Sequence, residues 1–243
     1  MRITEKLGMD MEGLIANGPI TIVAFGDSVT HGAVGAGEID YETVYWNRLR
    51  QMLNERRNYV PVNVINAGIG GINAKMSLAR MQRQVLDHHP DLLIVCFGLN
   101  DVNGPLEEYL SSLEEIFRRS REAGVETVFM TPNMLNTQVS PDTEEKYLSY
   151  AAKTADYQNS GRMDLYMGKA VELAEKMQIK VCNCYEKWKE MCKETGSNPY
   201  LANRINHPTK EMHQLFAQML YDCIFEENIA SSAGMESTMT REA

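Results

Sequence analysis

Short apolar runs alternate with longer amphipathic segments along most of this chain. Five runs rich in β-branched and other apolar residues are strand candidates, at 20–25, 62–66, 92–97, 125–130 and 179–183. Between them, apolar residues recur every three or four positions, as on one face of a helix. These helix candidates cover 41–57, 74–88, 106–123, about 161–177 and about 209–226. Strands that alternate with helices of this length predict right-handed βαβ units, and therefore a parallel sheet with helices on both faces.

Two segments depart from this alternation. Residues 133–160 are polar and contain Pro141, and we expect a loop followed by a helix over the carboxyl edge of the sheet. Residues 229–243 are small and polar, which predicts a flexible C-terminal tail. The sequence shows neither an internal repeat nor a linker, so we expect residues 1–228 to form a single domain.

The composition narrows the classes of function. A chain of 243 residues with 44% hydrophobic and 23% charged residues is typical of a globular protein. Its net charge of -9 argues against nucleic acid or an anionic membrane as the main partner. No apolar run approaches the roughly 18 residues that a membrane span requires. The first twenty residues lack the apolar block of a secretory signal, so we expect a cytoplasmic location and five reduced, buried cysteines.

Residues able to carry chemistry are associated with four of the five strand candidates. Asp27 and Ser28 follow the first, segment 66–71 completes the second, and segment 98–101 follows the third. Segment 203–208 comes well after the fifth. The loops after parallel strands open at one edge of the sheet, so we expect these groups to converge there. Taken alone, Ser28 is either the N-cap of a helix or a nucleophile.

These four blocks, in this order, resemble the SGNH (GDSL) hydrolase superfamily of esterases and lipases. Gly26-Asp27-Ser28 matches the first block of the family, a glycine of segment 66–71 the second, segment 98–101 the third, and His207-Pro208 the last. The blocks extend over nearly the whole chain. The resemblance implies a flavodoxin-like, three-layer α/β/α fold, with about five parallel strands in the order 2-1-3-4-5.

Carried over to this chain, the resemblance implies an esterase that acts on small acyl or O-acetyl esters. Ser28 is then the nucleophile and His207 its base, because a serine hydroxyl needs an imidazole within hydrogen-bond reach. The oxyanion hole consists of the backbone N–H groups of Ser28 and Gly71 and the side-chain amide of Asn100. Gly68 and Gly70 are less favoured than Gly71 for this role. Such donors stabilise the charge that develops on the tetrahedral intermediate.

Other polar residues of these blocks have supporting roles. We expect Asp27 to bond loop amides and Asp101 to brace the loop of Asn100. His31 is interpreted as part of a loop or of the pocket wall. The resemblance calls for no metal and no cofactor. It implies a small-molecule ester as the partner, and the branches of the family that deacetylate sugars indicate an acetylated sugar. Short-chain acyl esters, thioesters and lysophospholipids stay open, as does the oligomeric state.

The chain departs from the family pattern at one position. The family has an aspartate three residues before the histidine, and Arg204 stands there. If Asn206 is an insertion, Asn203 takes that position, and its amide can orient the imidazole ring without supplying a negative charge. The analogous loss of charge in a serine protease costs ~10⁴ in rate. Three interpretations stay open: a Ser-His dyad helped by Asn203 or a backbone carbonyl, a substitute acid elsewhere, or a degenerate site that binds a ligand without catalysis.

Overall fold

A parallel sheet forms the centre of the protein, whose computed structural model describes residues 1–35 and 37–226. Its strands lie in the order β2-β1-β3-β4-β5. They are β1 (Ile20–Gly26), β2 (Val62–Gly68), β3 (Leu92–Cys96), β4 (Glu126–Met130) and β5 (Lys180–Cys182). The five predicted strands and their predicted order are confirmed. The predicted tail at 229–243 lies outside the described residues.

The central strand β1 is hydrogen-bonded to β2 on one side and to β3 on the other. Its last residue, Gly26, is paired with Gly68 of β2 and with Cys96 of β3. Every residue of β3 is buried, as is usual for a parallel strand covered on both faces. Because the three strands end at the same level, the loops that follow them begin side by side.

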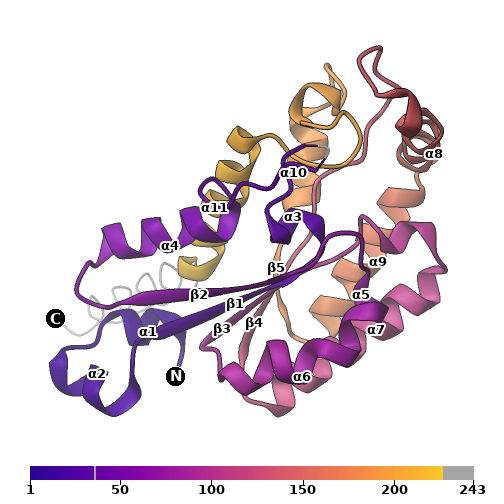
Figure 1. The fold of residues 1–243 in the computed structure, drawn as a ribbon. Helices are drawn as coiled ribbons and strands as arrows, with labels where there is room; N and C mark the ends of the chain where they lie inside the picture. The colour runs from indigo at the N-terminus through magenta and orange to yellow at the C-terminus, as the bar shows by residue number, and fades with distance from the viewer. Residues whose placement is uncertain (36, 227–243) are drawn as a thin grey trace, which may run out of the picture.

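Helices cover both faces of the sheet (Figure 1). On one face, α4 (Tyr45–Arg56) packs against α11 (Lys210–Phe225), and the two contact β2 and β5 respectively. On the other face, α7 (Leu106–Glu122) packs against α9 (Arg162–Lys176), and the two contact β4 and β5. The apolar sides of these helices and the sheet share one hydrophobic core. This arrangement confirms the predicted three-layer α/β/α fold.

The remaining helices are shorter or lie at the ends of the sheet. α3 (Ser28–His31) follows β1 directly, and α8 (Leu148–Asn159) follows the polar loop, as expected for residues 133–160. The hydrophobic pattern does not predict α1 (Ile3–Leu7), α2 (Met11–Asn17) or α10 (Cys184–Met191). Helices of this length contain too few turns to show a clear period in the sequence.

The helix predicted at 74–88 is broken into short pieces. α5 (Ala74–Ser77) and α6 (Met81–Gln84) are separated by a 3₁₀ turn that ends at Arg80, and a second 3₁₀ turn follows. The guanidinium of Arg80 donates hydrogen bonds to carbonyls at the ends of β2 and β1, at 2.6 and 3.2 Å. These bonds turn the segment toward the strand ends, which accounts for the loss of a continuous helix.

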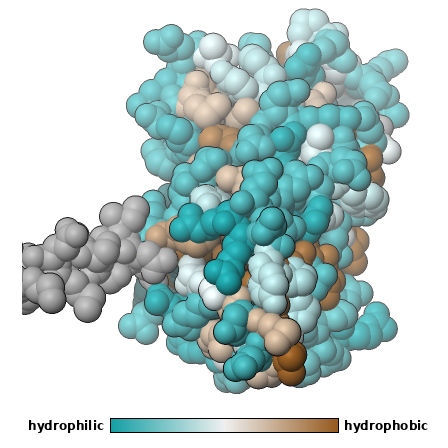
Figure 2. All heavy atoms as spheres, turned by 90° about the vertical axis from the view of Figure 1, so that its left-hand side faces the viewer, coloured by the Kyte–Doolittle hydropathy of each residue, from teal (hydrophilic) through white to brown (hydrophobic). Residues whose placement is uncertain are grey.

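Polar side chains lie mainly on the surface, and apolar side chains lie mainly in the core. The face shown in Figure 2 is mostly hydrophilic, with apolar side chains in small separate patches. All five cysteines are free and buried, as predicted. Within residues 1–35 and 37–226, no helix combines the length and the apolar character needed to cross a membrane.

Candidate active site

Ser28 lies on a sharp turn between β1 and α3. Asp27 is the N-cap of α3, and its Oδ1 accepts a hydrogen bond from the backbone N–H of Val29 at 3.0 Å. A side chain does not fit at Gly26, because its Cβ would lie 2.1 Å from Oγ1 of Thr30. The turn therefore places the Ser28 hydroxyl at the carboxyl end of the central strand, where it lines a cavity.

The predicted oxyanion-hole residues lie around the same cavity. Gly68 packs so closely against α3 that a Cβ there would lie 2.3 Å from a backbone nitrogen of that helix. Gly71 has a φ of 79°, in the left-handed region that favours glycine. The side-chain amide of Asn100 donates to the carbonyl of Ile72 at 2.9 Å, and its nitrogen carries a second N–H. Gly71 and Asn100 line the cavity together with Ser28.

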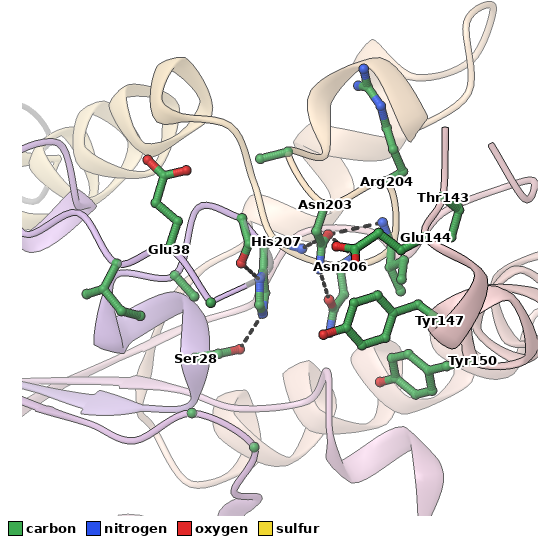
Figure 3. A pocket seen from close by; sticks show the side chains of 18 of the residues that line it. Ser28, Glu38, Thr143, Glu144, Tyr147, Tyr150, Asn203, Arg204, Asn206 and His207 are labelled. Atoms are coloured by element: carbon green, nitrogen blue, oxygen red, sulfur yellow. Dashed lines mark hydrogen bonds between the residues drawn. The ribbon is translucent and has the colours of Figure 1, made fainter. Parts of the chain in front are cut away.

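The imidazole of His207 lies between Ser28 and a main-chain carbonyl (Figure 3). Its Nε2 is 3.0 Å from Oγ of Ser28, and its Nδ1 is 3.3 Å from the carbonyl oxygen of Gly35. A carbonyl only accepts hydrogen bonds, so Nδ1 carries the proton and Nε2 accepts from the serine hydroxyl. Burial lowers the pKa of His207, and the bond to Gly35 partly opposes this shift. The ring is therefore neutral at pH 7 and able to take a proton from Ser28.

Asn203 holds the loop of His207 through the backbone. Its Oδ1 accepts hydrogen bonds from the N–H groups of Ile205, Asn206 and His207, at 2.9 to 3.0 Å. Its Nδ2 donates to Oδ1 of Asn206 at 2.9 Å. The Asn203 amide thus fixes the backbone position of His207. The orientation of the imidazole ring depends on other contacts, with Ser28 and Gly35.

Within the described part of the chain, no carboxylate is hydrogen-bonded to the His207 ring. Arg204 has a φ of 60°, and its Nε forms an ion pair with Asp142 at 3.1 Å. Asn203 bonds to the backbone, as described above, and Nδ1 faces the carbonyl of Gly35. The group beside Nδ1 is therefore a main-chain oxygen, which carries only a partial charge.

Two buried carboxyl groups brace the loops of the site. Burial raises the pKa of Asp27 to about 7, although the hydrogen bond from Val29 lowers it. Burial likewise raises the pKa of Asp101 to about 6, and its Oδ1 accepts from the N–H of Ala74 at 2.9 Å. Ala74 begins α5 three residues after Gly71, so Asp101 ties the loop after β3 to the loop after β2.

The site opens into a cavity of about 600 Å³. Tyr147 and Tyr150 lie on the side of the cavity opposite Ser28 and His207 (Figure 3). They come from the start of α8 and the turn before it, within the segment 133–160 that was expected over the carboxyl edge. Their signal in the sequence is a pair of aromatic residues in a polar stretch, which the sequence analysis did not single out.

The end of α3 and the loop after it supply a further wall of the cavity. His31 lies in this wall, as expected, and its Nδ1 accepts a hydrogen bond from the N–H of Gly70 at 3.3 Å. Gly35 and Glu38 also line the cavity, and the sequence analysis did not assign them to the site. Every residue type has a main-chain carbonyl, so the contact of Gly35 with His207 has no signature in the sequence.

Comparison with known proteins gives the class of this protein. Residues 24–215 match the GDSL-like lipase/acylhydrolase family. The match covers most of the chain and includes Ser28, Gly71, Asn100 and His207. The chain therefore belongs to this family of lipases and acylhydrolases, as the sequence resemblance indicated.

A bacterial lipoprotein is similar to part of this chain. The uncharacterized lipoprotein YqeF of Bacillus subtilis (strain 168) is 31% identical over 123 residues, which are 45% of this chain and 47% of that protein. The match thus spans about half the length of that relative, and the cytoplasmic location of this chain stays a prediction.

Solved structures show the same fold. Axe2, an acetylxylan esterase from Geobacillus stearothermophilus, is 19% identical with a TM-score of 0.66, over 84% of this chain and 94% of that chain. The acetyl xylan esterase AlAXEase is 18% identical with a TM-score of 0.66, over 84% of this chain and 98% of that chain. At these identities the likeness shows a shared fold.

Proposed function

We propose that this protein is a serine-dependent carboxylic ester hydrolase in which Ser28 and His207 act as a dyad. The observation that carries the proposal is the distance of 3.0 Å between Oγ of Ser28 and Nε2 of His207. Gly71 and Asn100 line the same cavity and provide donors beside the nucleophile. A nucleophile, a neutral base and an oxyanion hole are the three parts that acyl transfer requires.

In the first half of the reaction, Oγ of Ser28 attacks the carbonyl carbon of the ester while its proton moves to Nε2 of His207. The carbonyl oxygen becomes an oxyanion, which accepts hydrogen bonds from the N–H groups of Ser28 and Gly71 and from the amide of Asn100. The bond from the carbon to the alkoxy oxygen then breaks. Nε2 returns its proton to the leaving alkoxide, so that an alcohol departs and an acyl-serine remains.

In the second half, water replaces the alcohol. His207 takes a proton from the water molecule as its oxygen attacks the acyl carbon, and the same donors hold the second oxyanion. The bond to Oγ of Ser28 breaks, and Nε2 gives its proton back to that oxygen. The products are the carboxylic acid and the free enzyme, with the imidazole neutral again.

The Gly35 carbonyl takes over part of the role of the absent triad acid. It accepts the hydrogen bond of Nδ1–H and so keeps the lone pair of His207 on Nε2, facing Ser28. A neutral carbonyl stabilises the imidazolium less than a carboxylate does. We therefore expect turnover that is slower than in a full Ser-His-Asp triad, for which loss of the charge costs ~10⁴ in rate.

For the substrate, we propose a small acyl ester, and specifically an O-acetyl ester of a sugar. The rings of Tyr147 and Tyr150 offer flat apolar faces opposite Ser28, and polar side chains such as Thr143 and Asn206 line the same cavity. A site with such hydrogen-bonding groups rejects ligands that lack hydroxyls to satisfy them. The acetylxylan esterases of the same fold add support to this substrate class.

The activity is tested with p-nitrophenyl acetate and with a fluorophosphonate probe that labels activated serines. We expect turnover of the ester and labelling of Ser28, both absent in Ser28→Ala. A folded wild-type protein that neither turns over the ester nor reacts with the probe would instead be a ligand-binding module on this fold.

The substrate class is tested by measuring acetate release from acetylated xylo-oligosaccharides against hydrolysis of p-nitrophenyl octanoate. We expect the acetylated sugar to be preferred in kcat/KM. Tyr150→Ala is expected to raise KM for the sugar ester by about tenfold and to change KM for p-nitrophenyl acetate little, because the small ester does not extend to the ring. Preference for the octanoyl ester would contradict the sugar assignment and leave the esterase assignment intact.

A further inference from the structure

The Gly35 carbonyl belongs to a small closed loop between α3 and α4. The N–H of Asp40 donates to the carbonyl of Gly32 at 2.8 Å, and the N–H of Val34 donates to the carbonyl of Glu38 at 3.0 Å. The backbone on the two sides of the loop forms an antiparallel bridge. The described residues of this loop are thus held together by backbone bonds, and contacts with other parts of the chain set their distance from His207.

One lysine joins this loop to the segment that carries His207. Nζ of Lys210 lies 2.9 Å from Oδ2 of Asp40 and 3.5 Å from Oε1 of Glu38. Lys210 is the first residue of α11 and comes three residues after His207. The side chain of Lys210 therefore links the loop of Gly35 to the segment that carries His207.

Asp40 is the firmly held partner of this lysine. Its Oδ1 accepts hydrogen bonds from the N–H groups of Glu42 and Thr43, at 2.8 and 3.0 Å. Its side chain is 14% exposed, whereas that of Glu38 is 62% exposed. The hydrogen bond from Lys210 is the largest of the effects that hold the pKa of Asp40 well below its usual range. Asp40 therefore presents a fixed carboxylate to Lys210.

The His207 segment is equally well held on its own side. The N–H of Ala202 donates to the carbonyl of His207 at 2.8 Å, and the N–H of Thr209 donates to the carbonyl of Tyr200 at 2.9 Å. The bonds of Asn203 described above fix the same segment. The described residues of the two segments are thus each held by backbone hydrogen bonds. The segments meet at the contact between Nδ1 and Gly35, and the ion pair spans the junction between them.

We propose that Lys210 and Asp40 form a positioning pair, which holds the Gly35 carbonyl against Nδ1 of His207. The inference rests on the proposed function and extends it by naming what performs the orienting task of the absent triad acid. Neither side chain touches the substrate, and both act through the main-chain oxygen. Other charged or titratable groups near His207 are Glu38 on the loop, buried His213 on α11, and the Arg204–Asp142 pair across the cavity.

The sharpest test is the double variant Asp40→Asn/Lys210→Met, because it removes the pair without changing the net charge. We expect kcat/KM for p-nitrophenyl acetate to fall by about ten- to a hundredfold, as for other losses of positioning. The fall is expected in kcat, with KM changed little. The melting temperature is expected to stay near that of the wild type, since an ion pair made by a half-exposed lysine contributes only about 0–1 kcal/mol.

The pH profile of kcat/KM distinguishes a positioning role of the Lys210–Asp40 pair from a direct effect of its charges on His207. The bond to Gly35 raises the pKa of His207, so its loss lowers the acidic pKa of kcat/KM. If the pair acts by positioning, Asp40→Asn and Lys210→Met each lower that pKa. If it acts by charge alone, Asp40→Asn lowers the pKa and Lys210→Met raises it. Opposite shifts, or an unchanged double variant, would overturn the proposal.

Three further variants complete the experiment. Lys169→Met removes an exposed lysine that pairs with Glu172 on α9, away from the cavity, and is expected to leave kcat/KM and its pH profile unchanged. Glu38→Gln, at the more exposed partner of Lys210, is expected to lower kcat/KM less than Asp40→Asn does, and Lys210→Arg to keep most of the activity. If Glu38→Gln has the largest effect instead, the Lys210–Asp40 assignment is wrong. Lack of turnover in the wild type would contradict the proposed function itself.

Discussion

The two sides of the candidate site are positioned in different ways. Ser28 and Gly71 lie within a few residues of the ends of adjacent strands, so the register of the parallel sheet sets their relative position. His207 lies far beyond the end of β5, on a loop held by individual hydrogen bonds. Asn203 fixes that loop from within, and Gly35 meets the ring from a different part of the chain.

This difference shows where the site depends on the whole fold and where it depends on single contacts. The strand ends are fixed by a ladder of hydrogen bonds and a buried core, which one substitution outside the core changes little. The loop of His207 has a few polar contacts, and the loss of one leaves several backbone groups unpaired. Substitutions on the strand side should therefore separate chemistry from stability, whereas those on the loop side should affect both.

Ser28→Ala is the largest expected effect and tests the strand side. We expect kcat/KM for p-nitrophenyl acetate to fall by at least ~10⁴, because the nucleophile is lost. The melting temperature should change little, since the turn is held by Asp27 and Gly26. Ser111→Ala on the exposed side of α7 is the matched control and should keep full activity. Unchanged turnover in Ser28→Ala would exclude this serine as the nucleophile.

His207→Ala is expected to cost ~10³–10⁴ in kcat/KM and to remove the acidic limb of the pH profile. In the wild type, burial places the pKa of His207 below its ordinary value of 6.5, so activity should persist to lower pH than for an exposed histidine. The measurement is kcat/KM from pH 4.5 to 9. His88→Ala, at an exposed histidine, serves as the control. A wild-type profile flat over this range would point to a different base.

Asn203→Ala tests the loop that carries His207. It is expected to lower both stability and kcat/KM, with a smaller loss of kcat/KM than in Ser28→Ala or His207→Ala. Three N–H groups lose their acceptor, so the free energy of unfolding should fall by about 1–3 kcal/mol. Displacement of His207 should also lower kcat/KM by about ten- to a hundredfold. Asn203→Asp keeps an acceptor oxygen, so it should retain most of the stability and most of kcat/KM. Urea unfolding and ester turnover measure the two. Full activity in Asn203→Ala would show that the loop is held without this amide.

Asp27→Asn is expected to affect turnover least. Burial in the folded protein raises the pKa of this carboxyl from 3.8 to about 7, so the protonated form is favoured below about pH 7. The stability that this proton supplies is complete below about pH 4 and is lost as the pH rises through 7. The asparagine keeps an acceptor for Val29 without the buried charge. The variant should therefore gain about 1–3 kcal/mol over the wild type between pH 5 and 8. If urea unfolding gives the same difference in stability between variant and wild type at every pH, the expectation is contradicted.

The fold and the strand side of the site could be predicted from the sequence because both depend on local patterns. Runs such as 20–25 and 92–97 are apolar throughout, and the helices between them have a regular period. Ser28 and Asn100 stand at fixed offsets from strand ends, so the predicted topology already placed them at one edge. The helix at 74–88 was predicted as one piece, because its pattern does not show that Arg80 bonds to the ends of two strands.

The partner of His207 was decided by the tertiary structure. Asn203 stands at a position where an orienting side chain was conceivable, yet its oxygen is occupied by three backbone N–H groups. The ring instead meets the carbonyl of Gly35, a residue far away in the sequence. A main-chain carbonyl is common to all residues, and the approach of two loops depends on contacts such as that of Lys210 with Asp40. The sequence by itself thus determined the strands and the candidate nucleophile and base, whereas only the packing of distant loops determined which oxygen faces the ring of His207.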